Sequence, residues 1–106
     1  MKIFISQPMR GLTIEEIKKE RNDAIEFIKT HITDDFEVID NIQEDAHYTH
    51  PLEYLGEDFK MLPKADIVLM WGDYLTHSGC RLEKEAAENY GIRVECADSY
   101  KFKRLQ

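Results

Sequence analysis

Ile67-Val68-Leu69-Met70-Trp71 is the clearest strand signal in the chain, and it indicates the fold class. This apolar run follows Asp66 without a polar interruption, which is typical of a strand that helices cover on both faces of a parallel sheet. Shorter apolar runs at residues 2–5, 36–39 and 93–96 predict three further strands. We therefore expect strands to recur along the chain, with helical segments between them.

The first helical segment follows a turn-rich loop. Thr13 is placed as an N-cap, and Glu16, three positions later, completes a capping-box pattern. A single inward stripe follows at helical spacing and predicts a helix to about residue 31. The stripe consists of Ile14, Ile17, Arg21, Ala24, Ile25 and Ile28.

Two more helices are predicted between the later strands. One begins near Pro51, a residue favoured in the first turn, and stops at Pro63. The other is capped by Ser78, runs to about Tyr90 and is ended by Gly91. Residues 41–51 are polar and irregular and are expected to form a loop, and the structure of the tail from residue 98 is left open.

The alternation of strand and helix predicts one α/β domain over residues 1–106. Right-handed crossovers would give a small doubly wound, mostly parallel sheet of about four or five strands with helices on both faces, of the Rossmann or flavodoxin type. Ligands of such sheets bind beyond the carboxyl ends of the strands, where strand order reverses. The loops at residues 6–12 and 72–77 and the start of the third helix should lie at that edge.

Composition narrows the possible partners. The formal net charge of −7 argues against a nucleic-acid polymer as partner, but leaves room for a small phosphorylated ligand. No apolar run approaches the roughly 20 residues of a membrane-spanning helix, and the first apolar run is too short for a signal peptide. Cys80 and Cys96 stand apart, without zinc or disulfide spacing, which favours the reducing cytoplasm as location. We also expect no metal and no cofactor.

Glu83 is the first candidate for chemistry. In the predicted helix it shares a face with Ala86, Ala87 and Tyr90, so its carboxylate should point inward near the positive end of the helix, where an anion is stabilised and could act as a nucleophile. Gly79 would let a ligand approach the helix start. Alternatively, Glu83 is an ordinary surface residue and Gly79 only a turn residue, which is the more frequent outcome for such patterns.

The loop after the first strand, Ser6-Gln7-Pro8-Met9-Arg10-Gly11, is a candidate anion site. Arg10 offers a forked donor, Ser6 a hydroxyl and Gly11 a backbone N–H. The loop matches no established phosphate-binding motif, and a surface loop with a solvated arginine is an equal alternative.

Several other residues suit structural roles better. Asp58, beside Glu57, has the pattern of a solvated acidic helix face, and Asp66 should organise a turn at the opposite end of the sheet. The two loop histidines, His47 and His50, lack a partner at metal-binding spacing. Trp71 could stack on a base, but an aromatic residue at the end of a core strand more often packs.

Taken together, three motifs resemble the nucleoside 2-deoxyribosyltransferase superfamily, including its nucleotide N-glycoside hydrolase branch and short phage or bacterial 2-deoxyribosyltransferase-like proteins. The resemblance covers residues 2–96, nearly the whole chain. The motifs are the first strand with Ser6-Gln7-Pro8-Met9-Arg10-Gly11, then Asp58-Phe59-Lys60-Met61-Leu62-Pro63-Lys64-Ala65-Asp66, and Ser78-Gly79-Cys80-Arg81-Leu82-Glu83 followed by Ala86-Ala87.

The resemblance implies a role for each motif. Glu83 would attack the anomeric carbon of a sugar, and Asp58 would bind the base and assist its departure. Ser6, Arg10 and Gly11 would hold a 5′-phosphate, with Gln7, Pro8 and Met9 completing that loop. His77, Ser78 and Gly79 would lie against the sugar, although His77 stands where the family often has Asp or Ser.

These roles imply cleavage or transfer at the N-glycosidic bond of a nucleoside or nucleoside 5′-monophosphate, through a covalent glycosyl-Glu83 intermediate. Arg10 favours a hydrolase over a transferase, and the resemblance implies a homodimer or larger homo-oligomer. A non-catalytic protein that binds a nucleotide or nucleotide-derived signal in the same pocket is the alternative. A purely structural protein is a third reading, which a wide separation of Asp58 and Glu83 would favour.

Overall fold

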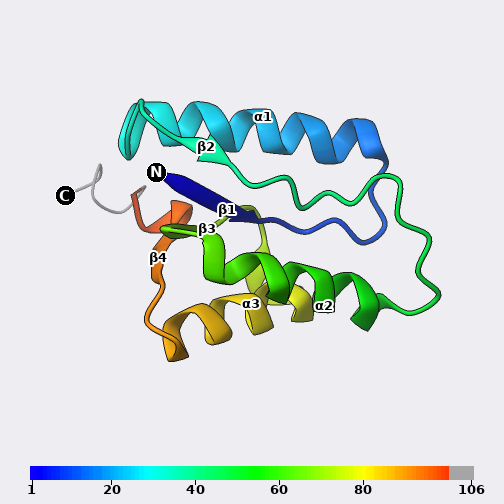
Figure 1. The fold of residues 1–106 in the computed structure, drawn as a ribbon. Helices are drawn as coiled ribbons and strands as arrows, with labels where there is room; N and C mark the ends of the chain where they lie inside the picture. The colour runs from blue at the N-terminus through cyan, green and yellow to red at the C-terminus, as the bar shows by residue number, and fades with distance from the viewer. Residues whose placement is uncertain (101–106) are drawn as a thin grey trace.

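The structure is a computed structural model, and it describes residues 1–100 of the chain. Its elements alternate as the sequence predicts (Figure 1). In chain order they are β1 (Lys2–Ser6), α1 (Ile14–His31), β2 (Glu37–Val38), α2 (Pro51–Met61), the short 3₁₀ turn η1 (Leu62–Lys64), β3 (Ile67–Met70), the 3₁₀ turn η2 (Tyr74–Thr76), α3 (Ser78–Asn89) and β4 (Arg93–Cys96). Residues 97–100 are helical, and the rest of the tail lies outside the described residues.

The four strands form one parallel sheet in the order β2-β1-β3-β4. The central pair is in register with Ile5 opposite Leu69 and Ser6 opposite Met70. The chain leaves β1 toward β2 on one side and later enters β3 on the other, so strand order reverses between β1 and β3. The predicted doubly wound α/β fold is therefore confirmed, and the site should lie beyond the ends of these two strands.

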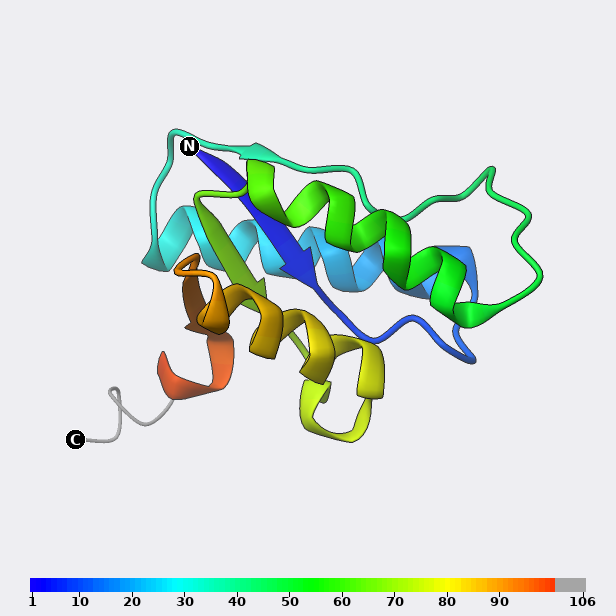
Figure 2. The ribbon, with the colours of Figure 1, turned by 60° about the horizontal axis from the view of Figure 1, so that its bottom comes forward.

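Side-chain alternation divides the core into two layers. Ile3 and Ile5 pack with Ile67 and Leu69 against the Ala24 and Ile28 face of α1. Phe4 points to the other face and joins a cluster beneath α2 and α3. Figures 1 and 2 show α1 alone on one side of the sheet and α2 beside α3 on the other. Residues of this second cluster are Phe4, Leu62, Val68, Met70, Tyr74, Cys80 and Ala87.

The predicted helix starts are confirmed at α1 and α2 and shifted at α3. Both hydrogen bonds of the Thr13–Glu16 capping box are present, and α2 begins at Pro51. The N-cap of α3 is His77 rather than Ser78, because His77 has extended backbone and its carbonyl accepts the first helical bond from Arg81. Ser78 is therefore the first residue of the helix.

The other end of α3 is also one residue from the prediction. The helix ends at Asn89, because Gly91 has φ +75° and reverses the chain. The amide N–H of Gly91 donates to the Glu88 carbonyl, and that of Ile92 donates to the Ala87 carbonyl. These two bonds form the paired closure that glycine favours after a helix.

The strand boundaries differ slightly from the predictions. The second strand is limited to Glu37–Val38, because only these two residues pair with β1 at the sheet edge. β1 extends one residue further than predicted, to Ser6. β3 ends at Met70, although the N–H of Trp71 still donates to the Ser6 carbonyl at 2.9 Å.

The loops after β1 and β3 meet at the reversal of strand order. Gly72 has φ +72°, and a Cβ there would lie 3.3 Å from Cδ of Pro8, so both backbone conformation and space favour glycine. The loop after β2 and the N-terminal ends of α2 and α3 lie at the same end of the molecule (Figure 1). Within residues 1–100, no helix has the length and apolar character to span a membrane.

Candidate functional site

A cavity of about 420 Å³ opens at this edge of the sheet, between the β1–α1 loop, α2 and the start of α3. Nine of the residues singled out from the sequence line it: Gln7, Pro8, Met9, Arg10, Asp58, His77, Ser78, Gly79 and Glu83. The fold thus brings together segments that are far apart in the chain. Gly11 does not line the cavity, and Ser6 lies behind it.

Glu83 is buried, with only 4% of its surface exposed. Its position on α3, four residues before Ala87, places it on the inward face as the sequence predicts. The hydroxyl of Ser6 donates a hydrogen bond of 2.7 Å to Oε1 of Glu83. Ser6 reaches Glu83 because strand alternation points it to the same side of the sheet as Phe4, toward α3. The hydroxyl of Ser6 therefore binds Glu83, whereas the family resemblance implies that it contacts a phosphate.

Asp58 lies next to Glu83, close enough for the two carboxyl groups to form a hydrogen bond when one of them carries a proton. The pattern of the bare sequence suggested a solvated acidic face for Asp58, and that interpretation is wrong. Glu57 takes the outward position and pairs with Lys60 at 2.8 Å, whereas Asp58 is half-buried and lines the cavity. The neighbouring positions differ because successive residues of a helix point about 100° apart.

The two carboxyl groups shift each other's pKa. Burial and the adjacent Asp58 together raise the pKa of Glu83 to about 9, while the Ser6 hydroxyl opposes the shift. Burial also raises the pKa of Asp58, but hydrogen bonds from Glu83 and Gln43 and the charge of Arg21 favour its anion. Of the two groups, Glu83 is therefore the one whose protonated form is favoured, and Asp58 is the one whose carboxylate is favoured.

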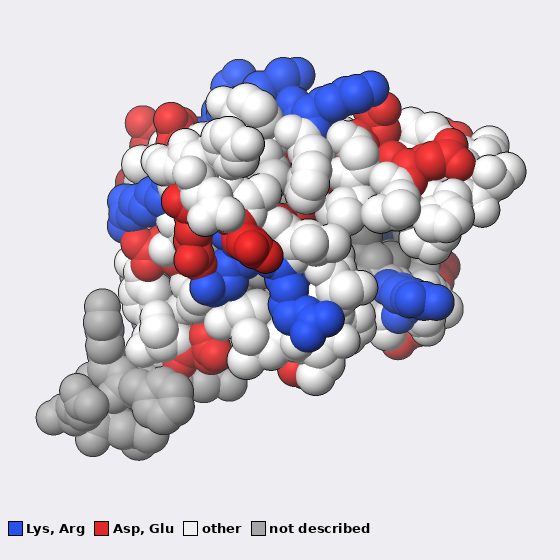
Figure 3. Space-filling model, turned by 90° about the horizontal axis from the view of Figure 1, so that it is seen from below, with Lys and Arg blue, Asp and Glu red and all other residues white. Residues whose placement is uncertain are grey.

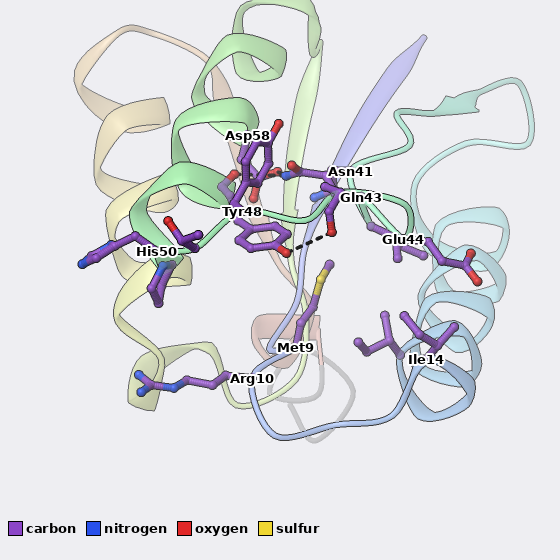
Figure 4. A pocket seen from close by; sticks show the side chains of 15 residues that line it. Met9, Arg10, Ile14, Asn41, Gln43, Glu44, Tyr48, His50 and Asp58 are labelled. Carbon is purple, nitrogen blue, oxygen red and sulfur yellow. Dashed lines mark hydrogen bonds between the residues drawn. The ribbon is translucent and has the colours of Figure 1, made fainter.

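Gln43 holds the other side of Asp58. Its Nε2 donates to Oδ1 of Asp58 at 2.9 Å and to the Tyr54 carbonyl at 3.0 Å. The backbone of Gln43 has φ +57°, an uncommon conformation for a residue with a side chain. Figure 4 shows Gln43 in the loop after β2, close to Asp58. This loop therefore contributes directly to the site.

A second, larger cavity of about 600 Å³ adjoins the first. The two share Met9, Arg10, Asn41, Pro51, Tyr54 and Asp58, so Asp58 borders both. The second cavity has an aromatic wall in which the rings of Tyr48 and Tyr54 meet edge to face at 4.8 Å, and Figure 4 shows Met9 and Ile14 on its other side. Apolar walls with a few amide and carboxylate groups suit a planar heteroaromatic ligand.

Donors for an anion lie at the mouth of the first cavity. Arg10 is exposed, and its side chain extends from the β1–α1 loop away from Ile14, on the side of His50 (Figure 4). The N-terminal end of α3 faces the cavity with Ser78 and Gly79, and the first N–H groups of a helix have no helical partner. A Cβ at Gly79 would meet no atom within 4 Å, so this position leaves the entrance open.

His77 borders the same entrance. Its Nδ1 lies 2.9 Å from the carbonyl of Asp73, which requires Nδ1 to carry a proton. In the neutral ring Nε2 is then an acceptor. His77 therefore offers a hydrogen-bond acceptor to a hydroxyl-bearing ligand in this tautomer.

Asp66 and Trp71 have the structural roles that the sequence suggests for them. Oδ2 of Asp66 accepts from the Lys2 N–H at 2.7 Å, at the end of the sheet away from the cavities. Trp71 packs against Phe27, with ring centroids 5.5 Å apart, and its indole N–H donates to Glu20. His50 caps α2 by accepting from the Leu52 N–H. In residues 1–100 no group of three or more His, Cys, Asp or Glu side chains is placed to hold a metal ion.

Some site residues were not singled out from the sequence. Asn41 and Gln43 belong to the loop that the sequence marks only as polar and irregular, and Tyr54 belongs to the second predicted helix. Cys80 lies beside Ser6 and Glu83, and burial raises the pKa of its thiol to about 11, so it is a neutral packing residue there. The signal that could have marked Asn41 and Gln43 is their place just after the second predicted strand, at the carboxyl edge of the sheet.

Charges around the site are mixed. Figure 3 shows basic side chains separated by acidic and uncharged ones over the face seen from below. This view has no extended basic area of the kind that a nucleic-acid polymer requires.

Comparisons with known proteins identify no relative. The chain matches no protein-family model, and searches of curated proteins and of solved structures find no match.

Proposed function

We propose that this protein breaks the N-glycosidic bond of a nucleoside 5′-monophosphate or nucleoside, with Glu83 as nucleophile and Asp58 as acid, and passes the sugar to water or to a second base. The observation that supports this proposal most directly is the hydrogen-bonded Asp58–Glu83 pair at the junction of two cavities. Two adjacent carboxyl groups in different protonation states are what covalent glycoside chemistry uses.

The proton of the pair must move before the reaction. A protonated Glu83 is not a nucleophile, so substrate binding would have to transfer its proton to Asp58 across their hydrogen bond. The total number of protons on the pair stays at one. The Ser6 hydroxyl, which donates to Glu83, stabilises the carboxylate that this transfer creates.

In the first step, a Glu83 oxygen forms a bond to the anomeric carbon while the glycosidic C–N bond breaks. The bonding electron pair leaves with the base nitrogen, and Asp58 gives its proton to the departing base. Asp58 is suited to this role because it borders both cavities, so that the sugar would occupy the smaller one and the base the larger one.

In the second step, water attacks the anomeric carbon of the glycosyl ester. The ester C–O bond breaks, Glu83 leaves as a carboxylate, and Asp58 accepts the proton from water. The pair again holds one proton, so the cycle closes. If a second base replaces water, the same steps give transfer, and the apolar Tyr48–Tyr54 wall is where that base would bind.

A phosphate group fits the mouth of the smaller cavity. Arg10 and the free N–H groups of the first turn of α3 provide donors, and the positive end of the helix favours an anion. A phosphorylated substrate therefore supports hydrolysis of a nucleoside monophosphate over transfer between nucleosides.

The test incubates the protein with ribo- and deoxyribonucleosides and their 5′-monophosphates, and measures free base by chromatography. We expect release from at least one substrate, and a loss of 10³-fold or more, on the order of what removal of an attacking group costs, in Glu83→Gln. Glu85→Gln, an exposed neighbour on the same helix, is the matched control and should keep wild-type activity. A folded wild-type protein that releases no base from the whole panel contradicts the proposal.

A second candidate function is binding without turnover. The protonation of Glu83 favours it, because a site that holds its nucleophile as a neutral acid could serve only to bind. Calorimetry with the same panel separates the two functions. Tight binding by both wild type and Glu83→Gln, with no base released by wild type, would establish a nucleotide-binding protein. A wide separation of Asp58 and Glu83 would have favoured the third reading, a structural protein, but the two residues line the same cavity.

A further inference from the structure

Arg21 occupies a position that α1 otherwise gives to apolar residues. The buried residues of this helix are Ile17, Arg21, Ala24 and Ile28, which lie on one face toward the sheet. Only 7% of the surface of Arg21 is exposed. A buried guanidinium is costly unless its donors are satisfied, so its partners show what it does there.

All hydrogen-bond partners of Arg21 within residues 1–100 are neutral. Nε donates to Oε1 of Gln7 at 2.9 Å, one terminal nitrogen donates to the Ile39 carbonyl at 3.4 Å, and the other donates to Oδ1 of Asn41. No ion pair within the described part of the chain includes Arg21. Its positive charge is therefore not cancelled by a carboxylate in contact.

The two amides that Arg21 holds are fixed at both ends. Gln7 also donates through Nε2 to the Ile17 carbonyl at 3.1 Å, and Asn41 donates through Nδ2 to the Ile5 carbonyl at 3.1 Å. The oxygen of each amide accepts a hydrogen bond from Arg21, and its NH₂ group donates to a main-chain carbonyl. These bonds allow only one orientation of each side-chain amide. Because Gln7 and Asn41 both line the smaller cavity, Arg21 joins the loop after β1 to the loop after β2 behind the site.

The charge of Arg21 also acts on Asp58. Its positive field favours the Asp58 anion, against the effect of burial and of Glu57 on the same helix. Asp58 and the exposed Asp40 in turn favour the charged guanidinium, although burial lowers the pKa of Arg21 to about 10. Other groups around the pair are Cys80 on α3, which is neutral, and Arg10 and His77 at the cavity mouth.

We propose that Arg21 is a positioning residue of this site: from behind the cavity it fixes the Gln7 and Asn41 amides, and its charge adds to the hydrogen bonds that favour the Asp58 anion. Its catalytic meaning rests on the proposed function, because a positive charge behind Asp58 makes that residue the stronger acid once it has taken the proton from Glu83. The charge relation itself is a property of the protein without substrate.

The experiment follows the carboxyl carbons of Asp58 and Glu83 by NMR as a function of pH, in the free protein, with Asp58→Asn and Glu83→Gln used for assignment. In Arg21→Met we expect the titration of Asp58 to move to higher pH and the side-chain NH₂ signals of Gln7 and Asn41 to shift. Arg21→Lys keeps the charge but removes the guanidinium donors that reach Gln7 and Asn41. Asp58 should therefore titrate close to wild type, while the side-chain NH₂ signals of Gln7 and Asn41 shift. Lys29→Met removes an exposed charge from the same helix and should change neither signal.

Asn41→Asp provides a second route if Arg21→Met does not fold. It places a carboxylate against the guanidinium, so the field at Asp58 weakens and its titration should again move to higher pH. An Asp58 titration that is unchanged in folded Arg21→Met, or in Asn41→Asp if the former does not fold, overturns the proposal. Because no substrate is present, a protein that releases no base would refute the proposed function and leave this result standing.

Discussion

The hydroxyl of Ser6, the last residue of β1, donates a hydrogen bond of 2.7 Å to the carboxyl group of Glu83, in the second turn of α3. Both side chains are buried, and 77 positions separate them in the chain. This bond joins the centre of the sheet to the helix that carries the proposed nucleophile. It positions Glu83 and favours its carboxylate, whereas burial and the adjacent Asp58 favour the protonated acid.

Ser6→Ala should destabilise the protein by about 1–3 kcal/mol, because it leaves a buried carboxyl oxygen without its donor. The measurement is urea unfolding followed by circular dichroism. Ser99→Ala removes an exposed hydroxyl and should change the free energy of unfolding by less than about 0.5 kcal/mol. Equal stabilities of the two variants would show that the Ser6–Glu83 bond contributes nothing measurable.

Glu83 should make the protein less stable as pH rises. Its pKa is about 9 in the folded protein and near its ordinary value of 4.5 when unfolded, so between these values the folded state binds more protons. Its contribution to stability is complete below pH 4.5 and is lost as pH rises toward 9, at most about 1.4 kcal/mol per pH unit. Glu83→Gln, which mimics the protonated acid, should lack this decline.

Urea unfolding of wild type and Glu83→Gln at pH 5 and pH 8 (chosen inside that window) measures the effect. The difference between the two proteins should grow in favour of the variant at the higher pH. Glu85→Gln should follow wild type at both values. A constant difference between wild type and Glu83→Gln would mean that Glu83 is already ionised in the folded state.

Gly79→Leu should block ligand binding without unfolding the protein. The new side chain would extend into the open cavity mouth, where a Cβ meets no atom within 4 Å. The expected loss is tenfold or more in affinity for the nucleotide that binds best, which corresponds to about 1.4 kcal/mol. Calorimetry measures it.

The matched control is Gly56→Ala, in the exposed middle of α2, where a Cβ is equally unobstructed. It should stabilise the helix by about 1 kcal/mol and leave binding unchanged. Wild-type affinity in a folded Gly79→Leu protein would place the ligand elsewhere.

Gln43 combines a strained backbone with a bond to Asp58, and two substitutions separate these features. Both Gln43→Ala and Gln43→Gly remove the bond, and both should raise the pKa of Asp58. The glycine variant should be more stable than the alanine variant by about 1 kcal/mol, because glycine adopts positive φ without a Cβ penalty. Urea unfolding compares the stabilities, and alanine as the more stable variant would contradict the assigned conformation.

The sequence determined the elements of this protein, because hydrophobic periodicity, caps and glycine stops are local signals. The run at residues 67–71 identified the central strand, Thr13 and Glu16 identified the start of α1, and helical spacing placed Glu83 on the inward face of α3. These signals were sufficient for the fold class and for the edge of the sheet at which the site lies.

Only the tertiary structure decided what surrounds Glu83. Strand order placed Ser6 beneath it, the path of the loop after β2 brought Gln43 to Asp58, and Arg21, which the sequence placed in an apolar stripe, joins two loops behind the cavity. The sequence predicts a solvated Asp58 because the helix that buries it, α3, lies later in the chain. Hydrogen bonds and shared protons depend on distances between segments, and no local pattern of residues contains those distances.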